Sequence, residues 1–438
     1  MACVTCGGLA VSFFFFVFRS SVATIEEYTP LYLKQKGLSA MLIGFVPTFG
    51  ILTQALGVPL ISYLSDKFRS RKLFLMFSII IVIPHILAFI LVQYNNTDCE
   101  SHNGTSNLAS ENTEVNKHNM PTNASETSQR STSAVLMTTK APTGGSSSEQ
   151  LYFVLAMVAL RGGYELVKRF IVTQITVATI THTKKDKTKY GYYAFWGQIG
   201  AGISLFAIGI LVGYFRVSIC NKMEPGYFLA FYYAAGFQLT TLIPLNWLKF
   251  EYLEKVIDYD EVKSVIFNPH YLLMLGICLY SGMCSAFQFR WEYWYIEELG
   301  GGPVLFAVGG FVRRPLVGLW YLLSRTAISR LGEYNAMCLA IFLFSGSFIA
   351  LAFIKAPWLV IVCDIFQSLA FVLLMSSMVV HFSKAGSKAS SAFIQGLVTM
   401  MLAGVGKEIG TVVFANSNDY KKYMERTDLG CGDEAMSD

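Results

Sequence analysis

Long apolar runs separated by short polar connections occur along almost the whole chain, and they constrain its fold more than any other feature. A helix of about 20 apolar residues crosses the roughly 30 Å hydrocarbon core of a bilayer, and only a helix satisfies its own backbone hydrogen bonds there. Eleven such runs are predicted as spans, at about 8–30, 39–63, 72–94, 151–180, 191–215, 226–248, 269–296, 303–324, 334–354, 357–382 and 389–415. The predicted fold class is therefore an all-α, polytopic membrane protein.

The composition agrees with a chain that lies mostly in lipid. Of its 438 residues, 53% are hydrophobic and 14% are charged, which differs clearly from a soluble globular protein. The net charge of +5 is explained by basic loops that meet anionic lipid, so nucleic acid is not an expected partner. The first run lacks a basic leading region and a small-residue cleavage site, and we interpret it as a retained span rather than a signal peptide.

Lys and Arg are concentrated in every second short loop, which predicts the orientation of the chain. The turn "SDKFRSRK" places Asp66, Lys67, Arg69, Arg71 and Lys72 between two apolar runs. This bias puts such loops, and the N-terminus with them, in the cytosol. The turn is predicted to act as a conformational gate in which Asp66 pairs with a base of the facing half or with a helix N-terminus. The alternative is that its cations, Lys67 and Lys72 above all, only anchor the topology.

Residues 95–150 are rich in Ser, Thr and Asn and poor in large apolar side chains, which predicts a disordered loop. Three N-glycosylation sequons occur in it, at Asn95, Asn103 and Asn123. Sequons are used only on the lumenal or external side, which agrees with the charge bias. Cys99 and Cys220 both fall in loops on that side and form a candidate disulfide. An external protein partner, if there is one, would bind through this loop.

The predicted spans divide into two halves at a polar connection. Charged turns follow the second span of each half, "SDKFRSRK" and then "SRTAISRLGEYN", as in a duplicated bundle. The predicted organisation is three spans in 1–94, the external loop 95–150, three spans in 151–248, a cytosolic inter-bundle loop 249–268, a five-span bundle 269–415 and a polar tail 416–438.

Ionisable residues within the spans are the candidate site, because a charge at bilayer depth costs on the order of 3 kcal/mol or more and usually faces a partner or a water-filled path. In "RGGYELVKRF" the helical period brings Arg161, Glu165, Lys168 and Arg169 to one face, where Arg161 and Glu165 can pair. Arg161 is expected roughly 15 Å below the outer surface, near the midplane. The pair is predicted either to bind a substrate and a proton or to be purely structural, with Lys168 and Arg169 reaching the cytosolic interface.

Five further residues complete the candidate cavity: Arg290, Glu292, Asp364, Lys407 and Glu408. Arg290 and Glu292 lie within "FRWEYW", which predicts either a cavity wall that stacks on a ring or sugar, or an interfacial aromatic belt. Lys407 and Glu408 are expected to neutralise partners on opposite sides of their helix. Glu26 and Glu27 are placed in the outer part of the first span and are not included in the site.

Four segments carry a resemblance to a known family: "DKFRSRK" at 66–72, "YGYYAFWGQIGAG" at 190–202, "WYIEELGG" at 294–301 and "DIFQSLAF" at 364–371. They are similar to motifs of the major facilitator superfamily, particularly its domain-containing-protein-six-like branch, which is related to sugar and nucleoside proton symporters. The resemblance implies two bundles that rock around a central site. It also places Asp364 where relatives carry an acid, which makes Asp364 the candidate for proton coupling.

The chain also departs from that pattern. Ala194 stands in place of an arginine of the branch, and Gln367 and Ser368 replace a His-Gly pair. Arg313 and Arg314 precede a proline where an acid is common. The superfamily has twelve spans, so the eleven predicted here lead us to expect that the twelfth is missing.

These observations predict a secondary active transporter that moves a small polar solute by alternating access, with or without proton coupling. The alternative is a non-transporting receptor or scaffold on the same fold. The sequence contains no HExxH, Gly-rich phosphate loop, EF-hand or nucleophile with a base, so neither an enzyme nor a cofactor or metal is expected. The host is either the plasma membrane or an endomembrane.

Overall fold

The computed structural model describes residues 2–92, 147–182, 189–219, 222–248, 250, 263–264, 267–382 and 391–416. Asn95, Asn103, Asn123 and Cys99 lie outside these residues, as does Cys220. The predicted glycosylation and disulfide therefore stay predictions. The chain divides into two units, of which the larger comprises Met1–Val92 and Val154–Asp438 and the smaller Gln93–Phe153. The described part of the smaller unit is the beginning of one helix, residues 147–153.

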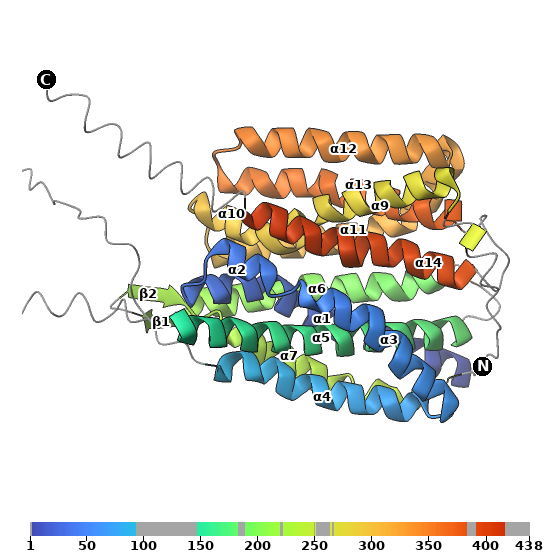
Figure 1. Ribbon diagram of the computed structural model, residues 1–438, viewed down its shortest axis with the longest axis horizontal. Coiled ribbons are helices and arrows are strands. Elements are labelled where there is room, and N and C mark those ends of the chain that lie inside the picture. Colours follow the sequence, from blue (N-terminus) through green and yellow to red (C-terminus); the bar gives the residue numbers. More distant parts are fainter. Residues whose placement is uncertain are drawn as a thin grey trace, which may run out of the picture. The chain divides into compact units, whose positions relative to one another are not determined.

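The first half of the larger unit is built from helices that lie side by side (Figure 1). They are α1 (Ala2–Gln35), α2 (Ala40–Phe45), α3 (Phe49–Lys67), α4 (Arg71–Leu91), α5 (Ser147–His182), α6 (Lys189–Tyr214) and α7 (Leu229–Thr240), followed by the 3-10 helix η2 (Pro244–Trp247). A small antiparallel hairpin, β1 (Arg216–Ile219) and β2 (Lys222–Pro225), connects α6 to α7. The sequence did not predict this hairpin, which is the exception to an otherwise helical chain.

The second half contains long helices, two of which change from α-helical to π-helical geometry along their length. Its elements are α9 (Pro269–Ala286), the π-helix η3 (Phe287–Trp291), α10 (Glu292–Glu298), α11 (Pro303–Leu331), α12 (Glu333–Phe353), α13 (Pro357–Phe382), α14 (Ser391–Thr399) and the π-helix η4 (Met400–Gly406). Residues 407–416 continue helically after η4. Hence α9, η3 and α10 form one continuous rod, as do α14, η4 and residues 407–416.

Within the described residues, 8 helical segments are long and apolar enough to cross a membrane. Three further helical stretches, α2 with α3, α5, and α7 with η2, correspond to the remaining predicted spans. The apolar sequence of α5 is interrupted by four charged residues, Arg161, Glu165, Lys168 and Arg169. Large apolar side chains are exposed on the outer helices, among them Phe342 and Phe353, as a lipid-facing surface requires. The predicted polytopic helical fold is confirmed.

Two predicted boundaries differ from the structure. The run 39–63 is broken between Phe45 and Phe49, where Pro47 cannot continue the hydrogen-bond ladder of α2. The predicted charged loop "SRTAISRLGEYN" is wrong, because α11 extends to Leu331 and α12 begins at Glu333. Gly332, with φ of +80°, makes this turn alone, since glycine adopts the left-handed region without steric cost.

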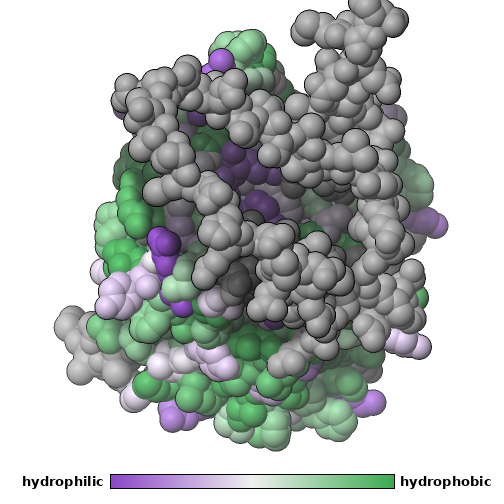
Figure 2. All heavy atoms as spheres, turned by 90° about the vertical axis from the view of Figure 1, so that its left-hand side faces the viewer, coloured by the Kyte–Doolittle hydropathy of each residue, from purple (hydrophilic) through white to green (hydrophobic). Residues whose placement is uncertain are grey.

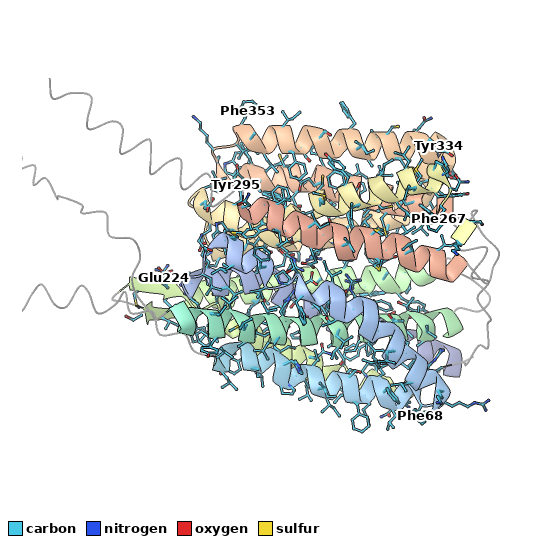
Figure 3. The ribbon with its side chains drawn as sticks, in the orientation of Figure 1. Phe68, Glu224, Phe267, Tyr295, Tyr334 and Phe353 are labelled. Carbon is cyan, nitrogen blue, oxygen red and sulfur yellow. The ribbon has the colours of Figure 1, made fainter. Side chains whose placement is uncertain are left out.

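The predicted turn at "SDKFRSRK" is present between α3 and α4. Arg69 has φ of +48°, and Lys72 Nζ donates to Asn246 O at 3.2 Å, which ties the turn to η2 of the same half. Asp66 lies in the last turn of α3, but its side chain is not among those described, so the gate pairing stays a prediction. Lys67 is exposed, whereas Arg71 is buried. In Figure 3, Phe68 of this turn lies at the opposite end of the helices from Glu224.

α6 packs closely against both α1 and α11 and so links the two halves. On α6, Gly200 faces the backbone of Phe16 on α1, and Gly202 faces Pro315 on α11. A Cβ atom at Gly200 would meet the carbonyl group of Phe16. Small residues at such positions let helix backbones approach, as the glycine pattern "WGQIGAG" predicts.

We expect Gly200→Ala to lower the free energy of unfolding by about 1–3 kcal/mol, because the added methyl group would force α1 and α6 apart. Thermal unfolding of the purified protein in detergent measures the change. Gly236→Ala on α7 is the matched control, since a Cβ there meets nothing within 4 Å. Equal unfolding temperatures for wild type and Gly200→Ala would contradict the close approach.

Candidate functional site

Two adjacent carboxylates of α1 form ion pairs with cations of other helices. Glu26 accepts from Lys168 Nζ on α5 at 2.7 Å and from Lys407 Nζ at 3.1 Å. Glu27 accepts from both Arg313 and Arg314 of α11. Neighbouring positions on an α-helix point about 100° apart. Glu26 and Glu27 therefore join two different groups of charges.

The first group, which we name the basic cluster, has four cations and three carboxylates: Arg161, Lys168, Arg290 and Lys407 with Glu26, Glu165 and Glu408. Within α5, Glu165 pairs with Arg161 at 2.8 Å and with Lys168 at 2.5 Å. Arg290 of η3 pairs with Glu408 at 2.6 Å. With every carboxylate ionised, this cluster holds one excess positive charge.

The second group, which we name the acidic cluster, has two cations and three carboxylates: Arg313 and Arg314 with Glu27, Glu292 and Asp364. Arg313 also donates to the carbonyl oxygen of Gln288 at 2.8 Å. The amide of Gln288 donates in turn to Asp364. These side chains are almost fully buried. With every carboxylate ionised, this cluster holds one excess negative charge.

The π-helix η3 and the residue that follows it contribute to both clusters. Arg290 belongs to the basic cluster, and Glu292, the first residue of α10, belongs to the acidic cluster. The ring of Phe289 lies near cations of both clusters, with Lys407 Nζ 5.0 Å and Arg314 Cζ 5.3 Å from its centre. Single π-helical turns inside α-helices occur frequently at functional sites.

A small cavity opens on the basic cluster. It is lined by Arg161, Arg290 and Glu26, together with Trp291, Thr411 and apolar side chains of α1 and α2. The open space is about 10 Å³, which is room for about one water molecule. A solute larger than water can enter only if the surrounding helices move apart.

The buried aromatic residues of α10 and η3 form an interior wall. Trp291, Tyr293 and Trp294 are each at most 2% exposed, so "FRWEYW" is not an interfacial belt. Trp291 faces the cavity, while Tyr293 stacks on Phe306 of α11 with ring centres 4.8 Å apart. Of this segment, Arg290 and Trp291 line the cavity, and binding of a ring or sugar to it stays a prediction.

The chain has extensive similarity to known transport proteins. The sequence model of the MFS_1 like family matches residues 9–416. The chain belongs to this family. It is thus an integral, multi-pass membrane protein of a transporter superfamily. Its family points to a transporter rather than to an enzyme.

Solved structures share the fold at low sequence identity. The nucleoside transporter NupG has a TM-score of 0.64 at 14% identity, with 95% of this chain and 91% of that chain covered. A bacterial homolog of the human lysosomal transporter Spinster, in an inward-facing and unoccupied conformation, has a TM-score of 0.65 at 10% identity, covering 98% and 85%. A D-xylose-proton symporter has a TM-score of 0.56 at 12% identity, covering 94% and 91%.

The structure brings all seven predicted cavity residues into the two clusters. Arg161 and Glu165 pair as the helical spacing predicts, and Lys407 and Glu408 do contact partners on different helices. Lys168 differs from expectation: it does not reach the interface but is 5% exposed. Two carboxylates at 2.5 and 2.7 Å hold it in the interior.

Besides Lys168, sequence reasoning missed four members of the site, Glu26, Glu27, Arg313 and Arg314. The signal was present, since "EE" and "RR" both fall inside long apolar runs, where any charge calls for a partner. What the sequence did not show is that α1 and α11 face each other at this depth. Glu27 and Arg313 are 286 positions apart in the chain.

We expect Glu27→Ala to lower the free energy of unfolding by about 3–5 kcal/mol, because it leaves two buried guanidinium groups without their shared carboxylate. Thermal or chemical unfolding in detergent measures this loss. Glu224→Ala in β2, outside both clusters, should change stability little and serves as the control. A Glu27→Ala protein as stable as wild type would show that the pairs to Arg313 and Arg314 are not formed.

Proposed function

We propose that this protein is a secondary active transporter that moves a small polar solute across its membrane by alternating access. The observation that carries the proposal is that central ion pairs join the two halves. Glu26 and Glu27 of the first half pair with Lys407, Arg313 and Arg314 of the second. A rocking motion must break and remake these pairs, so a bound solute that competes for them would shift the balance between two states.

A further pair closes one end of the same interface. Lys34 of α1 donates to Glu297 of α10 at 2.6 Å, and the hydroxyl group of Tyr227 donates to the same carboxylate at 2.9 Å. Seen from this end, hydrophilic residues appear in the upper middle of the face and at places on its edge, with hydrophobic residues along the sides (Figure 2). Because each charged side chain is 28% exposed, the ion pair contributes little free energy. We propose that it is a reversible outer lock, external if the N-terminus is cytosolic.

The acidic cluster supports coupling to protons. Glu292 and Asp364 both approach Nη1 of Arg313, and three carboxylates face two guanidinium groups. Like charges at such distances in a poorly solvated interior do not all ionise together. We propose that the cluster holds one exchangeable proton. The similar D-xylose-proton symporter is a proton-linked protein by its own description.

The solute is proposed to be small and polar, and a ring in it would meet an aromatic surface once the helices move apart. Trp291 presents an aromatic surface to the cavity, and aromatic side chains bind rings well. The similar structures include transporters of a nucleoside and of xylose. A receptor or scaffold on the same fold would bind such a solute without moving it.

We expect the purified protein in liposomes to take up at least one member of a radiolabelled panel of sugars, nucleosides and small organic acids. Glu165→Gln should reduce that uptake at least tenfold, because Arg161 and Lys168 lose their shared carboxylate. Glu224→Gln is the control and should transport as wild type does. Binding of a panel member without uptake would favour the receptor alternative, and no uptake of any member would contradict the proposal.

We expect Lys34→Ala to increase the population that is open at the Glu297 end by a few-fold. The effect is modest because a partly exposed ion pair contributes little free energy. Spin labels at Tyr214 and Phe353, which are 82% and 80% exposed and lie on different halves, report the opening as a longer distance. Lys36→Ala is the matched control. Identical distance distributions for wild type and Lys34→Ala would exclude a lock at this pair.

A further inference from the structure

We infer that the cavity between Arg161 and Arg290 binds a carboxylate group, and that the transported solute is a small organic acid. The inference rests on the proposed transport function and goes beyond it by naming the class of solute. It follows from three features of the basic cluster: unused donors, an excess charge and the chemistry of the remaining wall.

The two arginines carry donors that no described residue of the protein accepts from. Arg161 is 1% and Arg290 7% exposed, and each uses Nη2 for one carboxylate, Glu165 and Glu408 respectively. Nε and Nη1 of Arg161 and Nε of Arg290 have no hydrogen-bond partner among the described residues. An unsatisfied buried donor is costly, more so on a charged group. A carboxylate is the acceptor that matches guanidinium geometry best.

The excess charge of the cluster matches one carboxylate. Four cations face three carboxylates, so a single added negative charge would neutralise the group. Arg169 lies on the same helix and bonds to neutral oxygens, Gln54 Oε1 at 2.8 Å and Ala403 O at 2.9 Å. Its charge adds to the positive potential. A neutral sugar or nucleoside would leave this potential uncompensated in a poorly solvated interior.

The one acid on the cavity wall does not oppose an anion. Glu26 lines the cavity, but its oxygens accept from Lys168 at 2.7 Å and from Lys407 at 3.1 Å. Both lysines offset its charge. The hydroxyl groups of Thr29 and Thr411 are likewise engaged, donating to carbonyl oxygens one turn earlier on their own helices.

The remaining wall is apolar or aromatic, including Trp291, Pro30 and Leu33. It fits a carboxylate attached to a small apolar or aromatic body. Arg161 lies on the first half of the protein and Arg290 on the second. Once the helices have moved apart enough to admit it, a carboxylate held by both arginines would bridge the halves. It would stabilise that state over one in which the two arginines are separated, which is the differential affinity that alternating access requires.

The test compares acids with their own amides, which share size and shape but not charge. Nicotinate with nicotinamide and lactate with lactamide are added to the full-length protein, and binding is measured by thermal shift in detergent and uptake in liposomes. We expect the acids to bind and to be taken up at least tenfold better than the amides. Arg290→Gln should abolish this preference, whereas Arg216→Gln, an exposed arginine in β1, should keep it.

The outcomes separate this inference from the proposed function. Uptake of amides, sugars or nucleosides that equals or exceeds uptake of the acids would overturn the inference and leave transport standing. Uptake of nothing in either panel would overturn both. The comparison of acid with amide in the wild-type protein decides the question even if Arg290→Gln does not fold. Arg290→Lys, which keeps the charge but not the planar fork, should retain part of the preference.

Discussion

The paired carboxylates of α1 are the constraint on which the interior of this protein depends. Glu26 and Glu27 stand side by side in the sequence, yet they face different groups of cations on α5, on α11 and on the last helix. Because Glu27 is buried and the Glu26 side chain is only 14% exposed, each needs cations at a fixed depth and direction. The positions of α5, α11 and residues 407–416 around α1 are therefore tied together by charge as well as by the glycine contacts of α6.

The two clusters have excess charges of opposite sign, which suggests that they bind different species. In the proposed mechanism, the excess of arginine and lysine next to the cavity binds an anionic solute, while the excess of carboxylate in the acidic cluster binds a proton. Each imbalance is costly alone in a poorly solvated interior. Loading one solute anion and one proton would neutralise both clusters, so that the interior crosses between its two states with less uncompensated charge.

Much of the fold was readable from the sequence because the bilayer leaves so few choices. Hydrophobic length and loop charge gave the spans and the "SDKFRSRK" turn, and motifs gave the family. The hairpin β1–β2 was missed because a strand pair of eight residues in all leaves no periodic signal. The site was predicted in part: Arg161 and Glu165 are four residues apart on one helix, whereas Glu27 and Arg313 meet only through tertiary packing, which a single sequence does not report.

The π-helical segments η3 and η4 occupy the two rods that contribute Arg290, Lys407 and Glu408. Each hydrogen bond of a π-helix spans one more residue than a hydrogen bond of an α-helix. Each segment therefore has the form of a one-residue insertion that the helix has absorbed without breaking. A relative that lacks such an insertion would keep the same rods, but its following side chains would be turned by about 100°. An alignment with such a relative would therefore need a gap inside each of these helices for the charged positions to correspond.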